Sequence, residues 1–448
     1  MKMNVSLKPL SEQTVVITGA SSGIGLTTAR LAAKRGAKLV LTARSGTALQ
    51  QLADEINSAG GTASMFVADV SKEEEVRAIA QHAFDTYGGF DTWINNAGVG
   101  LYGALDSVPI ADMRALFEAN FWGIVYGSRE AVAHLKHRGG ALINLGSEVS
   151  ERSVPLQGIY CASKHAIKGF TESLRMELED EGAPVSVSLI KPGQIDTPFT
   201  FNAKNFLSSE PHHVPPVYAP DAVARAILHC AEKPSRDVFV GGGGRLVAAL
   251  GHIAPGLTDK LMEATVIPGT PSGRTPRRPK EGSVLDTPSE HLVERGNYEG
   301  FVQKVSVYTE ARLHPVAAGA ILAGTSYVLS KIFGGSSHRP VKIEGRKGAS
   351  TAKALHIRLE ARKGREAEVE KLLLDILDSV NAEPGTRPWF GTRLSRSVFG
   401  IFETFPNEAG RRAHLSGTGA ALLMKRSNDL LVRPAQISKL DVVGAKPD

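Results

Sequence analysis

The stretch TVVITGASSGIG, residues 14–25, decides the fold of the first half of the chain. A short apolar run leads directly into a glycine-rich turn that opens a helical stretch, and this context makes the turn informative. Glycines permit the tight turn and let backbone amides approach a phosphate at the positive end of a helix. The stretch therefore predicts a dinucleotide-binding turn between a strand and a helix. An ordinary glycine-rich turn is the alternative, and its position after a strand disfavours it.

Outward from this stretch, short apolar runs alternate with helical stretches as far as Val240. The runs are TVVITG, KLVLTA, ASMFVA, DTWINN, GALINLGS, VSVSLIKPG and DVFVGG. Such alternation predicts a parallel sheet with helices on both faces. Residues 201–218 break the pattern with Pro, His and Ser, which is typical either of a loop over a substrate site or of a surface insertion.

The expected fold class is α/β, with three successive parts. Residues 1–255 form a Rossmann-type doubly wound domain, 256–353 an extension and linker with helical character, and 354–448 a small α+β ferredoxin-like domain. A chain of 448 residues is long enough for two domains, and its 42% hydrophobic and 22% charged residues are typical of a globular protein.

Charge and cysteine content exclude several function classes. The net charge of +6 comes from 52 basic and 46 acidic residues that are interspersed, which disfavours a nucleic-acid partner. Two cysteines, Cys161 and Cys230, provide neither a disulfide framework nor metal-ligand spacing, so no metal is expected. The N-terminal MKMNVSLKPL lacks the apolar run of a secretory signal. We therefore expect a cytoplasmic protein, with Cys161 as a small packing residue.

The expected extension holds two notable segments. Residues 266–290, rich in Pro and Arg, are typical of a linker. Residues 315–333, PVAAGAILAGTSYVLSKIF, are apolar and close to the roughly 20 residues that cross a bilayer. Basic residues after this segment favour a cytosolic place for the C-terminal part of the chain. Two interpretations stay open for 315–333, a helix packed on protein or at a dimer contact, and membrane association.

The end of the second predicted strand bears on the choice of cofactor. It reads Leu41-Thr42-Ala43-Arg44, so the first charged side chain after the strand is basic. An acidic residue there would bind the ribose hydroxyls and repel a 2′-phosphate, whereas arginine accommodates the phosphate. The sequence therefore favours NADP over NAD, with a solvated surface cation as the alternative role of Arg44.

Tyr160 and Lys164 lie four residues apart in YCASK, on one face of a predicted helix, and Ser147 ends the earlier strand LINLGS. A free tyrosine has a pKa of about 10, so proton transfer at neutral pH needs a shift of about three units, or roughly 4 kcal/mol. A neighbouring ammonium and an oxidised nicotinamide can supply it. The combination indicates acid/base chemistry at a carbonyl or alcohol.

At residues 10–255 the sequence resembles the short-chain dehydrogenase/reductase family. The motifs are TGASSGIG, Asp69, Asn95-Asn96-Ala97-Gly98, Asn120, Ser147, Tyr160-x-x-x-Lys164 and Pro192-Gly193-x-x-x-Thr197. The resemblance implies that Tyr160 donates the proton in reduction and that Ser147 polarises the carbonyl. It implies that Lys164 binds the nicotinamide ribose and lowers the Tyr160 pKa, while Asn120 holds a water in a proton relay.

The same resemblance implies the contacts of an NADP (NADPH) cofactor. Asp69 would contact the adenine, the Asn95–Gly98 run would line the cofactor, and Thr197 with its neighbours would hold the carboxamide. The predicted cofactor-binding residues are Gly19, Ser21, Ser22, Gly23, Ile24, Gly25, Arg44, Asp69, Val70, Asn96, Ala97, Gly98, Tyr160, Lys164, Pro192, Gly193, Ile195 and Thr197. We expect an oxidoreductase, in a homo-oligomer, that acts on a small and lipophilic carbonyl or alcohol. The intact set disfavours a non-catalytic scaffold.

Residues 354–443 resemble the antibiotic biosynthesis monooxygenase family. The resemblance rests on the element order and on AEPGT, Trp389-Phe390, GIFETFPNEAG and AHLSG, while Pro388 beside the strand departs from it. It implies a ferredoxin-like fold that dimerises through its sheet and oxidises a phenol or quinol with oxygen alone. Asn381, Trp389 and His414 are the residues to inspect, with a helix end, a core residue and a helix surface as their plain alternatives. Oxygenation, dimerisation and small-ligand binding all stay open.

Overall fold

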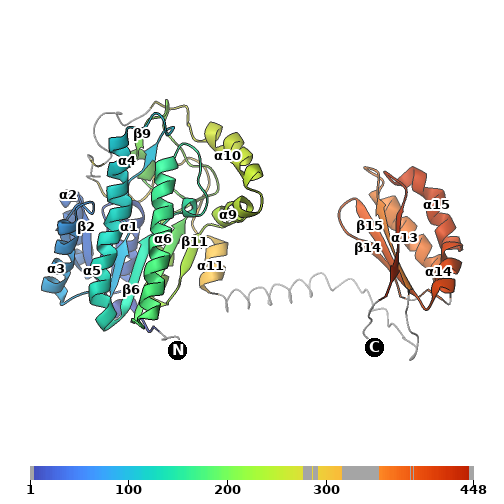
Figure 1. The fold of residues 1–448 in the computed structure, drawn as a ribbon, viewed down its shortest axis with the longest axis horizontal. Coiled ribbons are helices and arrows are strands. Elements are labelled where there is room, and N and C mark those ends of the chain that lie inside the picture. The colour runs from blue at the N-terminus through green and yellow to red at the C-terminus, as the bar shows by residue number, and fades with distance from the viewer. Residues whose placement is uncertain are drawn as a thin grey trace. The chain divides into compact units, whose positions relative to one another are not determined.

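The computed structural model describes residues 5–275, 285, 291–314, 353–383, 385–386 and 388–442 (Figure 1). The chain divides into two compact units, residues 1–331 and 332–448. The apolar segment 315–333 and most of the expected linker lie outside the described residues. Within the described part of the chain, no helix has both the length and the apolar character to cross a membrane.

A seven-stranded parallel sheet forms the centre of the first unit, in the order β11-β7-β6-β4-β1-β2-β3. Its strands are β1 (Thr14–Thr18), β2 (Lys38–Ala43), β3 (Thr62–Val67), β4 (Thr92–Asn95), β6 (Gly140–Leu145), β7 (Val185–Pro192) and β11 (Asp237–Val240). These are the seven predicted runs, and the Rossmann-type sheet is confirmed. Every residue of β1, β6 and β7 is buried, because helices cover both faces of the sheet.

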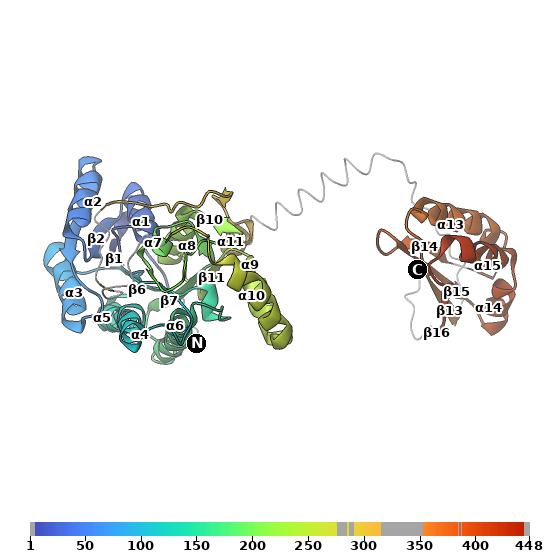
Figure 2. The ribbon, with the colours of Figure 1, turned by 90° about the horizontal axis from the view of Figure 1, so that it is seen from above.

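Two helical layers cover the sheet (Figure 2). The helices on one face are α1 (Gly23–Lys34), α2 (Gly46–Ser58) and α8 (Pro220–Glu232), and those on the other are α3 (Glu73–Tyr87), α5 (Gly123–Arg138) and α6 (Gly158–Asp180). Alternate residues of β1 serve the two layers, since Val15 and Ile17 belong to the first hydrophobic cluster and Val16 to the second. This is the period-2 pattern of a strand buried on both sides.

Short elements complete the end of the sheet where β1, β4 and β6 finish. They are β5 (Leu101–Tyr102), α4 (Ile110–Phe117), the π-helix η2 (Glu118–Trp122), η3 (Glu148–Ser150), β8 (Gln194–Ile195), α7 (Phe199–Asn202), β9 (Lys204–Asn205) and β10 (Val217–Tyr218), with η1 (Leu10–Glu12) at the start of the chain. Residues 201–218 thus hold two strands, of which β9 pairs with β5. A buried ion pair of 2.9 Å between Lys204 Nζ and Asp112 fastens this segment to α4.

Much of the expected extension folds onto the first unit. The predicted first domain ends with α9 (Gly243–Ile253), and the elements of the extension are α10 (Pro255–Gly269), β12 (Val302–Gln303) and α11 (Val307–Leu313). Strand β12 pairs with β10, and the Thr309 hydroxyl on α11 donates to the Phe239 carbonyl of β11 at 3.0 Å. The described residues of the extension up to His314 therefore pack on the first unit, in addition to connecting it to the rest of the chain.

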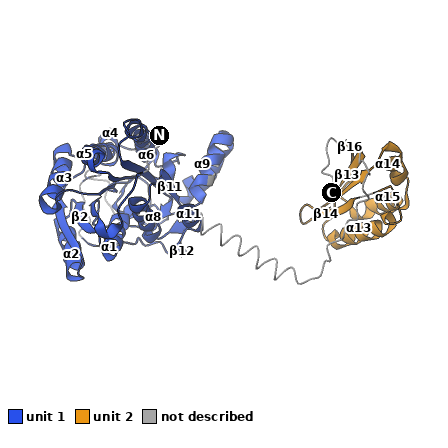
Figure 3. Cartoon of the chain, turned by 90° about the horizontal axis from the view of Figure 1, so that it is seen from below, with its two compact units in different colours: residues 1–331 blue, residues 332–448 orange. Residues whose placement is uncertain are grey.

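The second unit is a four-stranded antiparallel sheet with its helices on one face (Figure 3). Its elements are β13 (Lys353–Glu360), α13 (Glu366–Val380), β14 (Trp389–Arg393), β15 (Val398–Phe405), α14 (Glu408–Leu415), α15 (Thr418–Leu430) and β16 (Gln436–Asp441), with strand order β14-β15-β13-β16. The predicted α+β order is confirmed. The apolar positions of α13 are buried as their spacing predicts, namely Val369, Leu372, Leu373, Ile376 and Val380.

Candidate active site

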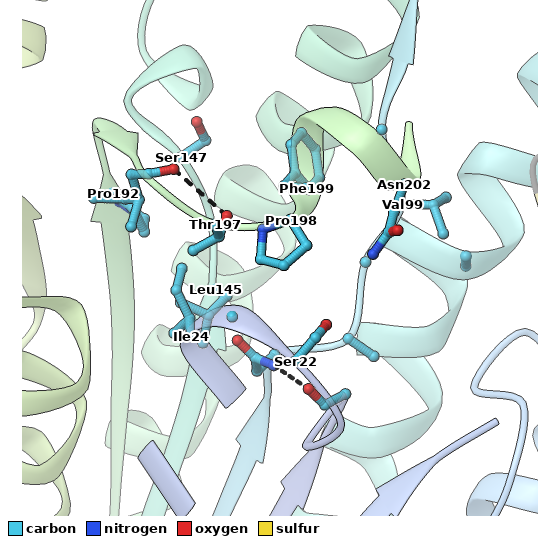
Figure 4. Close-up of a pocket in the computed structure, with 18 of the residues that line it drawn as sticks. Ser22, Ile24, Val99, Leu145, Ser147, Pro192, Thr197, Pro198, Phe199 and Asn202 are labelled. Atoms are coloured by element: carbon cyan, nitrogen blue, oxygen red, sulfur yellow. Dashed lines mark hydrogen bonds between the residues drawn. The ribbon is translucent and has the colours of Figure 1, made fainter. Parts of the chain in front are cut away.

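A pocket lies at the carboxyl ends of the parallel strands of the first unit (Figure 4). All of the predicted site residues except Gly25 and Asn120 line it. The glycine turn after β1 forms one end, and the segments after β6 and β7 form the other. This is where open α/β sheets bind ligands.

The glycine turn is held so that the start of α1 faces the pocket. Gly19 adopts φ +67°, and a Cβ there would lie 2.8 Å from the Ala97 Cα. A Cβ on Gly25 would lie 2.1 Å from the Gly19 carbonyl oxygen, so Gly25 serves close packing of the turn and does not line the pocket. The N-cap residue Ser22 makes no capping hydrogen bond with its side chain. The Gly23 amide donates to the Val293 carbonyl at 2.9 Å, so the next amides of α1 are the ones that we expect to take the diphosphate of a dinucleotide.

Arg44, directly after β2, and Asp69, after β3, line the end of the pocket that we expect to take the adenosine. The Arg44 guanidinium donates a hydrogen bond to the Leu285 carbonyl. Asp69 accepts hydrogen bonds from the amide and hydroxyl of Ser71 at 3.0 and 2.8 Å, which fix its carboxylate. The Arg44 side chain thus lines the pocket, and its contact with a 2′-phosphate stays a prediction.

Tyr160, Lys164 and Ser147 meet at the other end. The Lys164 Nζ lies 5.7 Å from the centre of the Tyr160 ring and donates to the Leu145 carbonyl at 2.8 Å. Burial raises the pKa of the Tyr160 phenol above its ordinary value, and a hydrogen bond with the Ser147 side chain acts in the opposite direction. Burial also lowers the pKa of Lys164 to about 8. The lowered Tyr160 pKa that we expected is therefore not supplied by the protein side chains alone, and the phenol is held protonated.

Asn120 lies in the π-helix η2, fully buried and behind the pocket wall. Its Oδ1 accepts from the Val99 amide at 2.7 Å, and its Nδ2 donates to the Val99 carbonyl at 3.0 Å. The side chain therefore fixes the segment that comes after the Asn95–Gly98 run. Its role as a water holder stays a prediction.

Several polar residues of the pocket were not singled out from the sequence, and three of them are in contact with one another: Glu148, Gln194 and His213. Burial raises the pKa of Glu148 to about 7, while a hydrogen bond with Gln194 opposes this shift. His213 Nδ1 lies 2.9 Å from Gln194 Oε1, and burial lowers the pKa of His213 to about 4. His213 is therefore neutral, with Nδ1 as the donor. Two features of the sequence could have indicated these residues. Glu148 directly follows Ser147, and His213 lies in the irregular segment 201–218.

Glu148 gives a pH-dependent contribution to stability. Because its folded pKa of about 7 is above the ordinary value of 4.5, the folded state holds a proton that the unfolded state has lost between these values. Stability conferred by this group falls as pH rises through that window. We expect Glu148→Gln to reduce the loss of Tm between about pH 5 and about pH 8, measured by calorimetry. Identical pH slopes in wild type and variant would contradict the buried carboxyl.

Within the described residues, no group of three His, Cys, Asp or Glu side chains is placed to hold a metal ion. Cys161 and Cys230 are both buried thiols without a disulfide. Burial raises the pKa of each to about 11, so neither is an activated nucleophile.

In the second unit, Trp389 and His414 line a common cavity, and Asn381 does not. His414 is 6% exposed, so its interpretation as a helix-surface residue is wrong. Asn381 is exposed at the end of α13, as its alternative predicted. Burial opposes protonation of His414, but contacts with Glu403 and Glu383 outweigh it and raise the His414 pKa.

Comparison with known proteins gives a family for the first unit. Residues 13–206 match the family model described as short chain dehydrogenase. The uncharacterized oxidoreductase YxnA of Bacillus subtilis is 46% identical over 327 residues, which cover 72% of this chain and 92% of that protein. The 11-beta-hydroxysteroid dehydrogenase A of Sesamum indicum is 36% identical over 235 residues, 50% of this chain and 67% of that protein. The solved alcohol dehydrogenase of the archaeon Thermococcus sibiricus, complexed with 5-hydroxy-NADP, is 27% identical with a TM-score of 0.45, over 51% of this chain and 95% of that one.

Proposed function

The chain belongs to the short-chain dehydrogenase family, and from this premise we propose an NADP-dependent oxidoreductase that interconverts a carbonyl and an alcohol by hydride transfer. One observation carries the proposal. Tyr160, Lys164 and Ser147 line the same pocket, and the glycine turn after β1 lines its other end. A screen of ketones, aldehydes, sterols and quinones, followed by NADPH absorbance with the full-length protein, tests it. Failure with every class would contradict it.

In the direction of reduction, the hydride for the carbonyl carbon would come from NADPH when it is bound. Tyr160 donates its phenolic proton to the carbonyl oxygen, and the Ser147 hydroxyl hydrogen-bonds the same oxygen. The protonated state of Tyr160 in its buried setting suits this donor role. Lys164, with its pKa lowered to about 8, exchanges protons near neutral pH and is one helical turn from the phenol. In the direction of oxidation the same residues act in reverse.

A lipophilic substrate fits the wall around Tyr160. Phe199 lies with its ring centre 5.4 Å from that of Tyr160, and it belongs to α7 above the glycine turn (Figure 4). Val99 and Tyr102 line the same pocket. The names of two relatives, hydroxysteroid dehydrogenases of Sesamum indicum and of Eggerthella lenta, support including sterols in the screen. Glu148 and His213 supply polar groups at the wall.

A second candidate function lies in the other unit and is the binding of a small ligand. If that ligand is a quinol or phenol, we propose its oxygenation in this unit as the alternative to binding alone. Glu403 on β15 is fully buried, and its Oε1 lies 3.0 Å from the His414 Nε2. Within the described part of the chain, Glu403 Oε2 and Trp389 Nε1 are buried without a hydrogen-bond partner. Both residues line the same cavity, whose other walls are mostly apolar. One ligand hydroxyl could donate to the carboxylate and accept from the indole, which would satisfy both groups.

We expect Glu403→Gln to weaken binding of a hydroquinone to the full-length protein about tenfold, because an ionic hydrogen bond becomes a neutral one. Tryptophan fluorescence or calorimetry without NADPH measures the affinity, and oxygen uptake separates oxygenation from binding. Glu370→Gln, whose carboxylate forms an exposed ion pair with Arg393, is the matched control. Equal affinity in Glu403→Gln and wild type would remove this candidate.

We also propose that the protein forms a homo-oligomer and that it is cytoplasmic, the latter as expected from the sequence. The sheet face of the second unit that its helices leave uncovered carries Phe390, Phe402 and Leu440, which are 44%, 38% and 39% exposed. Phe390 and Phe402 are paired across β14 and β15, so they form an apolar pair on this face. We propose this face as the homo-oligomer contact. Membrane association through 315–333 remains a proposal from the sequence. Fractionation tests it, because release of the protein into the soluble fraction without detergent would rule out membrane integration.

A further inference from the structure

Residues 291–298 of the extension lie directly behind the glycine turn, and we call them the cofactor strap. The Gly23 amide donates to the Val293 carbonyl at 2.9 Å, and Ser22 forms a parallel β-bridge with Val293. Glu294 forms an ion pair of 2.7 Å with Arg30 on α1. In Figure 2 the segment runs as an extended trace past α1. The strap is thus joined both to the turn and to the helix that the turn opens.

The strap has its second anchor at the segment after β8. Asp196 is 2% exposed, and its Oδ2 accepts from the Arg295 Nε at 2.6 Å. Its Oδ1 accepts from the Tyr298 amide at 3.3 Å. Gly296 approaches the same segment so closely that a Cβ there would lie 2.8 Å from the Thr197 carbonyl oxygen. A buried carboxylate therefore draws the strap onto the backbone that carries Thr197.

The glycine turn and the Thr197 segment also touch each other. A Cβ on Gly23 would lie 3.2 Å from the Thr197 Cβ. The turn, the strap and the Thr197 segment therefore meet with little space between them, and the Thr197 side chain fills the contact with the turn. None of the described strap residues lines the pocket, so the strap acts through the two segments that it joins.

We propose that the cofactor strap sets the spacing between the two halves of the dinucleotide site, with Arg295 as a positioning residue. This inference rests on the proposed function, together with the sequence-based expectation that the glycine turn takes the diphosphate and Thr197 the nicotinamide carboxamide. A ligand that spans both segments is bound well only when their separation is fixed before it arrives. The extension is then a working part of the cofactor site.

The test compares two nucleotides in binding experiments that need no substrate. NADPH spans both segments, whereas 2′,5′-ADP carries the adenosine end and lacks the nicotinamide half. We expect Arg295→Ala to raise the Kd for NADPH about tenfold, because a hydrogen bond to a buried charge is lost. The Kd for 2′,5′-ADP should change less than about twofold. Arg295→Lys should restore part of the NADPH affinity, since the charge returns without the planar fork.

Arg236→Ala is the matched control, because Arg236 forms an ion pair with Glu179 in which both side chains are 60% exposed. It should leave both Kd values unchanged. An unchanged NADPH Kd in Arg295→Ala, or equal weakening of both nucleotides, would overturn the inference while the proposed function stands. Failure of the wild-type protein to bind NADPH would overturn both.

Discussion

Tyr160→Phe is expected to lower kcat for carbonyl reduction by about 100-fold to about 10⁴-fold, because the substrate oxygen loses its proton donor. The phenyl ring should remain in place, since the Tyr160 ring already packs against Phe199 with 5.4 Å between the centres. Only the oxygen is removed, so the Kd for NADPH should change little. Steady-state kinetics with the best ketone of the screen, together with NADPH titration, measures both quantities.

Tyr126→Phe is the control for this experiment, because Tyr126 on α5 stacks on Trp122 and does not line the pocket. It should keep wild-type kcat. Retention of more than about a tenth of the activity in Tyr160→Phe would contradict the assignment of the phenol as general acid. A large rise in the NADPH Kd would instead show that the oxygen serves binding.

The sheet could be predicted from the sequence because its information is local. The strands of the seven-stranded sheet lie in the short apolar runs of the sequence, and burial on both faces makes every position of β1 apolar or small enough to pack. The turn at residues 18–25 was equally predictable, since Gly19 needs a positive φ that glycine adopts readily and Gly25 has no room for a side chain. The residues around Tyr160 were recognisable from their order along the chain.

The rest of the pocket depends on contacts between distant residues, which the sequence does not display. Lys204 and Asp112 are 92 positions apart, and their buried ion pair brings residues 201–218 over the site. Asp196 and Arg295 are 99 positions apart, and they draw the extension back onto the domain. A stretch rich in Pro and Arg is typical of a linker, so its composition hides the strap that begins just after it. Glu148 likewise lies against a distant residue, since a Cβ on Gly244 would clash with its Oε2.

The second unit shows the same division between pattern and contact. The apolar spacing of α13 predicted a buried face, and the structure confirms it. The sequence did not show that Glu403, in the middle of the apolar strand β15, lies beside His414 without exposure. The alternation of β15 predicts only which face of the sheet carries Glu403. Its partner, His414, belongs to α14. The candidate ligand cavity is lined by both residues, so it could not be predicted from either element alone.

Arg44→Asp is expected to reverse the preference between the two nicotinamide cofactors. Arg44 lines the adenosine end of the pocket and is the first charged side chain after β2. An aspartate there would repel a 2′-phosphate and accept hydrogen bonds from ribose hydroxyls. Like charges placed together cost several kcal/mol, so the KM for NADPH should rise about 100-fold or more while the KM for NADH falls. Kinetics with both cofactors at a fixed ketone concentration gives the ratio.

Arg44→Gln separates repulsion from the loss of a contact. It removes the positive charge and adds no negative one, so the KM for NADPH should rise only about tenfold. The hydrogen bond from Arg44 to the Leu285 carbonyl is lost or altered in both variants, and any effect of that contact should therefore be common to them. The difference between Asp and Gln reports the 2′-phosphate alone. If both variants kept the wild-type cofactor preference, Arg44 would be a surface cation and the case for NADP would lose its main support.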